Sequence, residues 1–162
     1  MLNTLKIKLA YIIAYWFGIG LIPLAPGTVA SMATLPLAYI LSKYGNLEIY
    51  IVVTAFISVI GIGASKIISI KMKTSDPSQI VVDEVSGQLI ALMFIPPETV
   101  WYILGFILFR FFDITKPGPI GWLDKNIKGG TGIMLDDILA GMFTSLVLWV
   151  SQNFYTFQIG VL

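Results

Sequence analysis

A predominantly apolar chain of 162 residues, of a length that suits a single domain over residues 1–162, carries most of its carboxyl groups in a few short polar segments. Apolar residues make up 57% of the sequence and charged residues 12%, a composition typical of membrane proteins. Six acidic residues lie in residues 76–84, 110–117 and 129–137. Carboxylates are costly near hydrocarbon, where they usually serve as metal ligands or in ion paths. The sequence therefore predicts a functional site built from these three segments.

Cysteine and histidine are both absent, and their absence excludes several kinds of chemistry. The chain has no disulfide, no thiolate nucleophile, no Cys/His zinc site and no Ser-His-Asp triad. Any hydrolytic activity has to depend on carboxylates, hydroxyls, lysine and a hard metal ion. The net charge of +1 provides no basic field, so nucleic acid is not an expected partner.

Turn residues divide the apolar sequence into helical segments. Residues 47–70 are the clearest membrane span, since about 20 apolar residues are needed to cross a bilayer. Residues 9–22 are too few for a full span, and residues 113–132 are predicted to be a loop. Asp76, followed by Pro77, is expected to begin a helix. The other expected helices cover residues 29–42, 76–95, 99–112 and a segment that starts near Met134. This pattern predicts an all-α, polytopic membrane bundle with some partly inserted short helices.

The expected hairpins place the loops at residues 23–28, 71–78 and 113–132 on one face of the membrane. Most lysines between the helices belong to this face, whereas the opposite face keeps only Lys43. Because cytoplasmic loops carry an excess of Lys and Arg, this asymmetry assigns the loop-rich face to the cytoplasm. The polar segments, and the site that they form, are expected on the same side.

Two acidic residues are each followed by a glycine at the same spacing. Asp83 and Gly87, and likewise Asp137 and Gly141, are four residues apart, so each pair shares one face of a helix. A glycine one turn after a carboxylate lets a neighbouring helix approach closely, which would bring acidic groups from two helices together. Ordinary packing of small residues is the alternative explanation.

Asp83 with Glu84, and Asp136 with Asp137, are adjacent acidic pairs expected near helix starts, and Asp113 adds a fifth carboxylate. Adjacent residues on a helix point about 100° apart, so one member of each pair can face the interior. Oxygen ligands of this kind suit Mg²⁺, which binds carboxylates together with phosphate oxygens and water. One pair alone could simply complement a helix dipole, but two pairs and a fifth carboxylate favour a metal site.

A phosphate-binding site is expected beside these carboxylates. Gly27, Thr28 and Ser31 lie where a helix begins, and the free backbone N–H groups there favour an anion. Lys116 and Arg110, the only arginine, could add positive charge. The alternatives are a simple cap for the helix start, an interfacial anchor for Arg110 and a solvated loop position for Lys116.

Four motifs follow one another between Gly18 and Gly141. They read Pro-Leu-Ala-Pro-Gly-Thr-x-x-Ser, Ile-Val-x-Asp-Glu-x-x-Gly-Gln, Arg-Phe-Phe-Asp-Ile-x-Lys-Pro-x-Pro-Ile and Gly-Gly-x-Gly-Ile-Met-Leu-Asp-Asp-x-x-Ala-Gly. Together and in this order, they resemble the phosphatidylglycerophosphatase A family. The resemblance implies a helical, Mg²⁺-dependent lipid phosphatase of the bacterial inner membrane, which converts phosphatidylglycerophosphate to phosphatidylglycerol at the cytoplasmic face.

The same resemblance assigns roles to particular residues. The implied functional residues are Asp83, Glu84, Asp113, Lys116, Asp136 and Asp137, with Gly27, Thr28 and Ser31 as phosphate contacts. The expected chemistry is attack by a metal-activated water or, as the alternative, an aspartyl-phosphate intermediate. A small cation transporter or channel subunit that uses the same carboxylates is the alternative function. Transport carboxylates belong near the bilayer midplane, whereas these are expected at helix ends.

Overall fold

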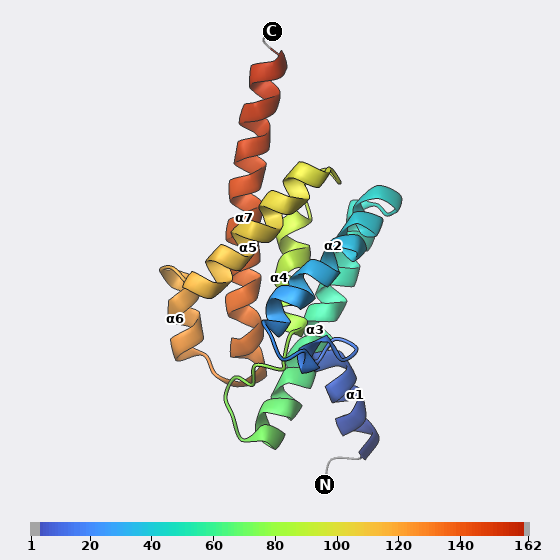
Figure 1. The fold of residues 1–162 in the computed structure, drawn as a ribbon, viewed down its shortest axis with the longest axis vertical. Helices are drawn as coiled ribbons and strands as arrows, with labels where there is room; N and C mark the ends of the chain where they lie inside the picture. Colours follow the sequence, from blue (N-terminus) through green and yellow to red (C-terminus); the bar gives the residue numbers. More distant parts are fainter. Residues whose placement is uncertain (1–3, 161–162) are drawn as a thin grey trace.

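The computed structural model describes the backbone of residues 4–160 and the side chains of residues 4–155. This part of the chain contains seven α-helices, one 3₁₀-helix and no strands, which confirms the predicted all-α class. The helices are α1 (Thr4–Ala14), α2 (Pro26–Tyr44), α3 (Leu47–Met72), α4 (Val82–Leu92), α5 (Thr99–Thr115), α6 (Pro119–Asn126) and α7 (Gly129–Gly160), and the 3₁₀-helix is η1 (Ile19–Leu21). The short helix α4 lies in the middle of the bundle, and α7 extends beyond the other helices at the C-terminal end (Figure 1).

Two helices in the described residues are long and apolar enough to cross a membrane. They are α3, with 26 residues, and the 27-residue part of α7 from Gly129 to Tyr155. Both present large apolar side chains on their surfaces, for example Val59 of α3 and Leu146 of α7. Large exposed apolar side chains of this kind are suited to contact with lipid rather than with water.

The central helix α4 is almost entirely enclosed, with nine of its eleven residues buried. Its crossing with α7 depends on two glycines. A Cβ atom on Gly87 would lie 2.6 Å from the backbone oxygen of Asp137, and one on Gly141 would collide with the backbone oxygen of Gly87. The carboxylate-to-glycine spacing therefore predicted a real close approach of two helices, and this approach brings Asp83 and Asp137 to the same place.

The predicted apolar segment over residues 9–22 is not one helix. α1 ends at Ala14, and left-handed backbone conformations at Trp16, with φ of 42°, and Gly18, with φ of 99°, turn the chain. The N–H of Val81 donates to the backbone oxygen of Ala14 at 2.9 Å, so the end of α1 is held against the start of α4. The segment consequently consists of the end of α1, a turn and η1 instead of one continuous helix.

The helix expected to begin at Asp76 starts at Val82 instead. Asp76 is exposed in a stretch of turns, and no side chain caps the N-terminus of α4. The N–H of Ile80 donates to the backbone oxygen of Pro77 at 2.9 Å, which closes a turn within this stretch. The Asp-Pro sequence therefore marks a turn, and our prediction that Asp76 caps a helix was wrong.

Residues 113–132 are not a continuous loop either. α5 includes Asp113, α6 begins at Pro119, and α7 begins at Gly129 rather than near Met134. Proline is favoured at the first position of a helix because its missing N–H would be unpaired there in any case. The proline that we interpreted as a loop residue thus begins a helix.

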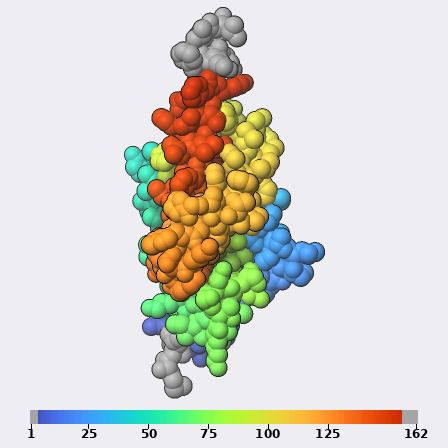
Figure 2. Space-filling view, turned by 90° about the vertical axis from the view of Figure 1, so that its left-hand side faces the viewer, coloured from blue at the N-terminus to red at the C-terminus, as the bar shows by residue number. Residues whose placement is uncertain are grey.

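The loops predicted to share a face do meet at one end of the bundle. Residues from the segments 25–27, 75–80 and 124–133 line a single cavity. Figure 2 shows the chain around α6, in orange, directly above the loop that follows α3, in green. The hairpin turns at Gly45 and Pro96 lie together around a different cavity. The two sets of loops thus line two different cavities, and their placement on opposite faces of a membrane stays a prediction.

Candidate active site

A cavity of about 270 Å³ lies between the start of α2, the start of α4, the end of α5, α6 and the start of α7. Its lining contains seven carboxyl groups but only three cationic side chains. The acidic residues are Asp76, Asp83, Glu84, Asp113, Asp124, Asp136 and Asp137, and the cationic residues are Arg110, Lys116 and Lys128. An excess of negative charge of this size, in partly enclosed surroundings, favours either protonation of some carboxyl groups or the binding of a cation.

Three of these side chains form what we call the carboxylate cluster: Asp83, Glu84 and Asp137. Each offers one carboxylate oxygen, and the three oxygens lie within 4.8 Å of one another. One oxygen of each residue is also enclosed without a hydrogen-bond partner among the described residues. Burial, and then the neighbouring charge of Glu84, raises the pKa of Asp83 well above its ordinary value. Oxygen donors that are close together, buried and unpaired fit a hard cation such as Mg²⁺.

The local sequence explains how the cluster is built. Asp83 and Glu84 lie in the first turn of α4, and Asp137 comes from α7 at the glycine crossing. Gly27, in the first turn of α2, makes room for Glu84, because a Cβ atom at Gly27 would collide with its carboxylate and would lie 3.3 Å from Nη1 of Arg110. A glycine at this position therefore allows both members of the α4 acidic pair to face the cavity.

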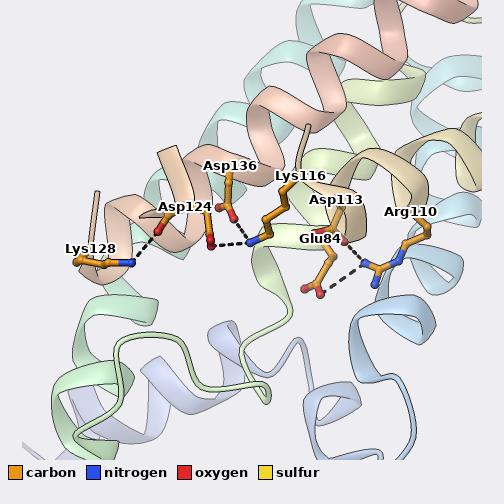
Figure 3. Close-up of polar contacts among 7 residues, drawn as sticks. All are labelled: Glu84, Arg110, Asp113, Lys116, Asp124, Lys128 and Asp136. Carbon is orange, nitrogen blue, oxygen red and sulfur yellow. Dashed lines mark hydrogen bonds and ion pairs between the residues drawn. The ribbon is translucent and has the colours of Figure 1, made fainter. Parts of the chain in front are cut away.

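Arg110 lies beside the carboxylate cluster. Its Nη1 atom is 2.5 Å from Oδ2 of Asp113, one turn away on α5, and 3.6 Å from Oε1 of Glu84 (Figure 3). Arg110 lines the cavity and its side chain is only 14% exposed, so it is not the interfacial anchor that we considered as an alternative. Its charge offsets part of the negative charge of two carboxylates, and the guanidinium geometry suits contact with further anionic oxygens.

Lys116 forms a second group, the lysine cluster, with Asp124 and Asp136. Its Nζ donates to Oδ2 of Asp136 at 2.5 Å and to Oδ1 of Asp124 at 2.7 Å (Figure 3). Burial lowers the pKa of Lys116, but the hydrogen bonds to the two carboxylates outweigh it, so the pKa is raised overall. Lys116 is therefore a charged residue of the cavity and not a solvated loop lysine.

The predicted metal ligands fall into two groups in the structure. Asp83, Glu84 and Asp137 come together, whereas Asp136 is bonded to Lys116 and lies outside the group of three. Asp113 is paired with an arginine rather than grouped with them. The division within the second acidic pair agrees with the expectation that adjacent helical residues point in different directions.

The predicted phosphate contacts also separate. Gly27 lines the cavity, but Thr28 and Ser31 do not. Ser31 is buried, and its hydroxyl donates to the backbone oxygen of Gly27 at 2.9 Å. The helix start lies at the cavity as expected, and phosphate contact by the two hydroxyls stays a prediction.

The sequence interpretation missed three charged residues of the cavity, namely Asp76, Asp124 and Lys128. Asp124 was overlooked because it lies in α6, which we predicted to be loop, and the helix-starting Pro119 is the signal that could have found it. Asp76 was predicted to cap a helix. Its position beside the cavity depends on a turn that the sequence pattern did not predict.

Comparison with known proteins provides independent evidence. The family described as phosphatidylglycerophosphatase A matches residues 12–152. Phosphatidylglycerophosphatase A of Escherichia coli (strain K12) is 37% identical over 140 residues, covering 86% of this chain and 81% of that protein. The Haemophilus influenzae protein of the same name is 38% identical over 143 residues, covering 88% of each chain.

A third relative carries a different name. A protein of Bacteroides thetaiotaomicron, provisionally named a phosphatidylinositol-3-phosphatase, is 35% identical over 154 residues, covering 89% of this chain and 94% of that protein. No solved structure is significantly similar to this chain. The extent of the family match, together with the two relatives of the same name, confirms the resemblance that the four motifs suggested. The chain belongs to the phosphatidylglycerophosphatase A family of phosphatases.

Proposed function

We propose that this protein hydrolyses the terminal phosphomonoester of phosphatidylglycerophosphate, giving phosphatidylglycerol and inorganic phosphate. Family membership supports the reaction, and the names of two relatives support the substrate. The observation that carries the proposal is the carboxylate cluster, whose buried oxygens without hydrogen-bond partners lie in a cavity that also contains three cationic side chains. Such a site suits a metal-assisted reaction at a phosphate group.

Mg²⁺ is the proposed cofactor, and Asp83, Glu84 and Asp137 would hold it. When bound, the ion would offset charge on the phosphate oxygens and lower the pKa of a water molecule. The donor set supports this choice, since every candidate ligand is an oxygen and the chain has neither cysteine nor histidine. In the cavity lining, carboxyl groups outnumber cationic side chains by more than two to one. Without a bound metal ion, this lining would repel a dianionic phosphate.

The cationic residues are proposed to bind and orient the phosphate group. Lys116 lines the cavity as a charged residue, and its ammonium group, which donates to Asp124 and Asp136, can also donate to a phosphate oxygen. Arg110 keeps Glu84 beside the other carboxylates and can share its remaining donors with the phosphate. The backbone at Gly27 lies at the start of α2, where the helix dipole adds a favourable field.

We also propose a multi-pass arrangement in the bacterial inner membrane, with the cavity at the cytoplasmic face. α3 and α7 are the candidate spans, and the shorter helices would be partly inserted around them. Several lysines lie at the cavity end, including Lys125 and Lys128, whereas Lys43 lies at the other end. This distribution supports the orientation because positive residues are enriched on the cytoplasmic side.

A labelling experiment tests the orientation. A single cysteine at Asn126, in a chain that has none of its own, should react with an impermeant maleimide only when the cytoplasmic side is accessible. A cysteine at Lys43 is the matched control and should react from the opposite side. Labelling of the residue-126 variant in intact cells from the periplasm would overturn the orientation.

The activity itself is tested with purified protein in detergent. We expect release of inorganic phosphate from phosphatidylglycerophosphate with Mg²⁺ and its loss after chelation by EDTA. Phosphatidylinositol 3-phosphate should be compared in the same assay, because one relative carries that name. Equal release in EDTA would exclude the metal, and no release with Mg²⁺ would exclude the phosphatase and favour the transporter alternative.

A further inference from the structure

Asp124 is a cavity residue to which neither the predictions nor the proposed reaction assigns a role. Its carboxylate shares the ammonium group of Lys116 with Asp136. The two carboxylates differ in exposure, since the side chain of Asp136 is 6% exposed and that of Asp124 is 37% exposed. Figure 3 shows both carboxylates directed at the ammonium group of Lys116, which is thus held by one buried and one partly exposed partner.

The two bonds to Lys116 differ in how easily they can be broken. Removing the partner of a buried charge is strongly unfavourable, which applies to Asp136. An ion pair with a partly exposed partner contributes little, because water can replace the lost partner. Asp124 is therefore the acceptor that another anion can replace.

The backbone near Asp124 can stay in place during such an exchange. Nζ of Lys128 donates to the backbone oxygen of Asp124 at 2.8 Å and so holds the last turn of α6. Ile120 of the same helix is buried, which fixes the helix against the bundle. Rotation of the Asp124 side chain is consequently sufficient to free one N–H of Lys116.

We propose that Asp124 is a displaceable counter-anion, which occupies Lys116 when no phosphate is bound and is replaced by the phosphate group of the substrate. The inference rests on the proposed function in one respect, namely that Lys116 contacts phosphate. The carboxylate of Asp124 returns to Lys116 when inorganic phosphate leaves. Asp124 thereby weakens phosphate binding and favours product release, because it competes for the same ammonium group and repels the dianion.

The test is a calorimetric titration of the Mg²⁺-loaded full-length protein in detergent with inorganic phosphate. We expect Asp124→Ala to lower the Kd for phosphate by about threefold or more, since both the competing acceptor and its repulsion are removed. Asp124→Asn, which keeps the shape of the side chain, should lower it in the same direction. Glu98→Gln is the matched control, because it removes an exposed carboxylate far from the cavity lining and should leave the Kd unchanged.

The same substitutions in the Lys116→Met variant test whether Asp124 affects phosphate binding through Lys116. There the Asp124 substitutions should tighten phosphate binding less than in the wild-type background, because the competition for the shared ammonium group is gone and only the repulsion between Asp124 and phosphate remains. An unchanged or raised Kd in both single variants would overturn the inference, as would equal tightening in the Lys116→Met background. Failure of the proposed function is a separate result: the wild-type protein would release no phosphate from the lipid, whatever the titrations show.

Discussion

The carboxylate cluster and the lysine cluster lie in the same cavity but satisfy their charges in opposite ways. The three side chains of the carboxylate cluster are close together and largely buried. One oxygen of each has no hydrogen-bond partner among the described residues. In the lysine cluster, one ammonium group joins two carboxylates by direct hydrogen bonds. The first arrangement is suited to holding a cation from outside the chain, whereas the second already contains a cationic side chain that its two carboxylates share.

This difference has a consequence for folding stability. Like charges in the carboxylate cluster oppose folding when no cation is bound, so that removing one of them relieves repulsion. Removing Lys116 instead leaves the buried Asp136 without its cationic partner, which is unfavourable. Stability measured without metal should therefore change in opposite directions in the two clusters, although catalysis should fall in both.

The largest expected effect comes from the carboxylate cluster. Asp137→Asn should reduce kcat/KM for the lipid phosphate by at least about a hundredfold, since even groups that only support metal ligands typically contribute ten- to a hundredfold. The melting temperature in EDTA should stay equal or rise, because one of three neighbouring charges is removed. Near wild-type activity would remove Asp137 from the site, and a lower melting temperature in EDTA would contradict the contrast between the clusters.

A smaller effect is expected from the lysine cluster. Lys116→Met should lower kcat/KM at least about tenfold, equivalent to about 1.4 kcal/mol of transition-state stabilisation. It should also destabilise the protein by about 1–3 kcal/mol in EDTA, because a buried acceptor loses its partner. Mg²⁺ affinity should be largely unchanged, which calorimetry can measure. If the activity stays near wild type, Arg110 becomes the candidate for the phosphate contact.

The sequence predicted the carboxylate cluster better than the lysine cluster for a physical reason. Asp83 and Asp137 are each followed by a glycine one turn later, and this spacing encodes the helix crossing that joins them. The bond between Lys116 and Asp124 depends instead on the short helix α6. Proline and glycine in this segment are as typical of a loop as of the start of a short helix. Local composition does not distinguish these two structures, whereas a packing motif repeated on two helices identifies a contact.

Side-chain direction was predictable for one acidic pair and not for the other. Asp136 and Asp137 diverge, as neighbouring positions on a helix should. Asp83 and Glu84 nevertheless both join the cluster, because Gly27 of a different helix leaves space for the Glu84 carboxylate. A long-range steric allowance of this kind is not visible in the sequence around the acidic pair.

The smallest expected effect concerns Ser31 and decides whether the start of α2 contributes hydroxyls or backbone to the site. The Ser31 hydroxyl donates to the backbone oxygen of Gly27 within its own helix and does not line the cavity. Bonds of this type are close to neutral for helix stability, so Ser31→Ala should change the free energy of unfolding by less than about 1 kcal/mol. It should change kcat/KM less than twofold in the phosphate-release assay. A tenfold loss with unchanged stability would instead show that the hydroxyl leaves Gly27 to bind phosphate, and the start of α2 would then supply side chains as well as backbone to the reaction.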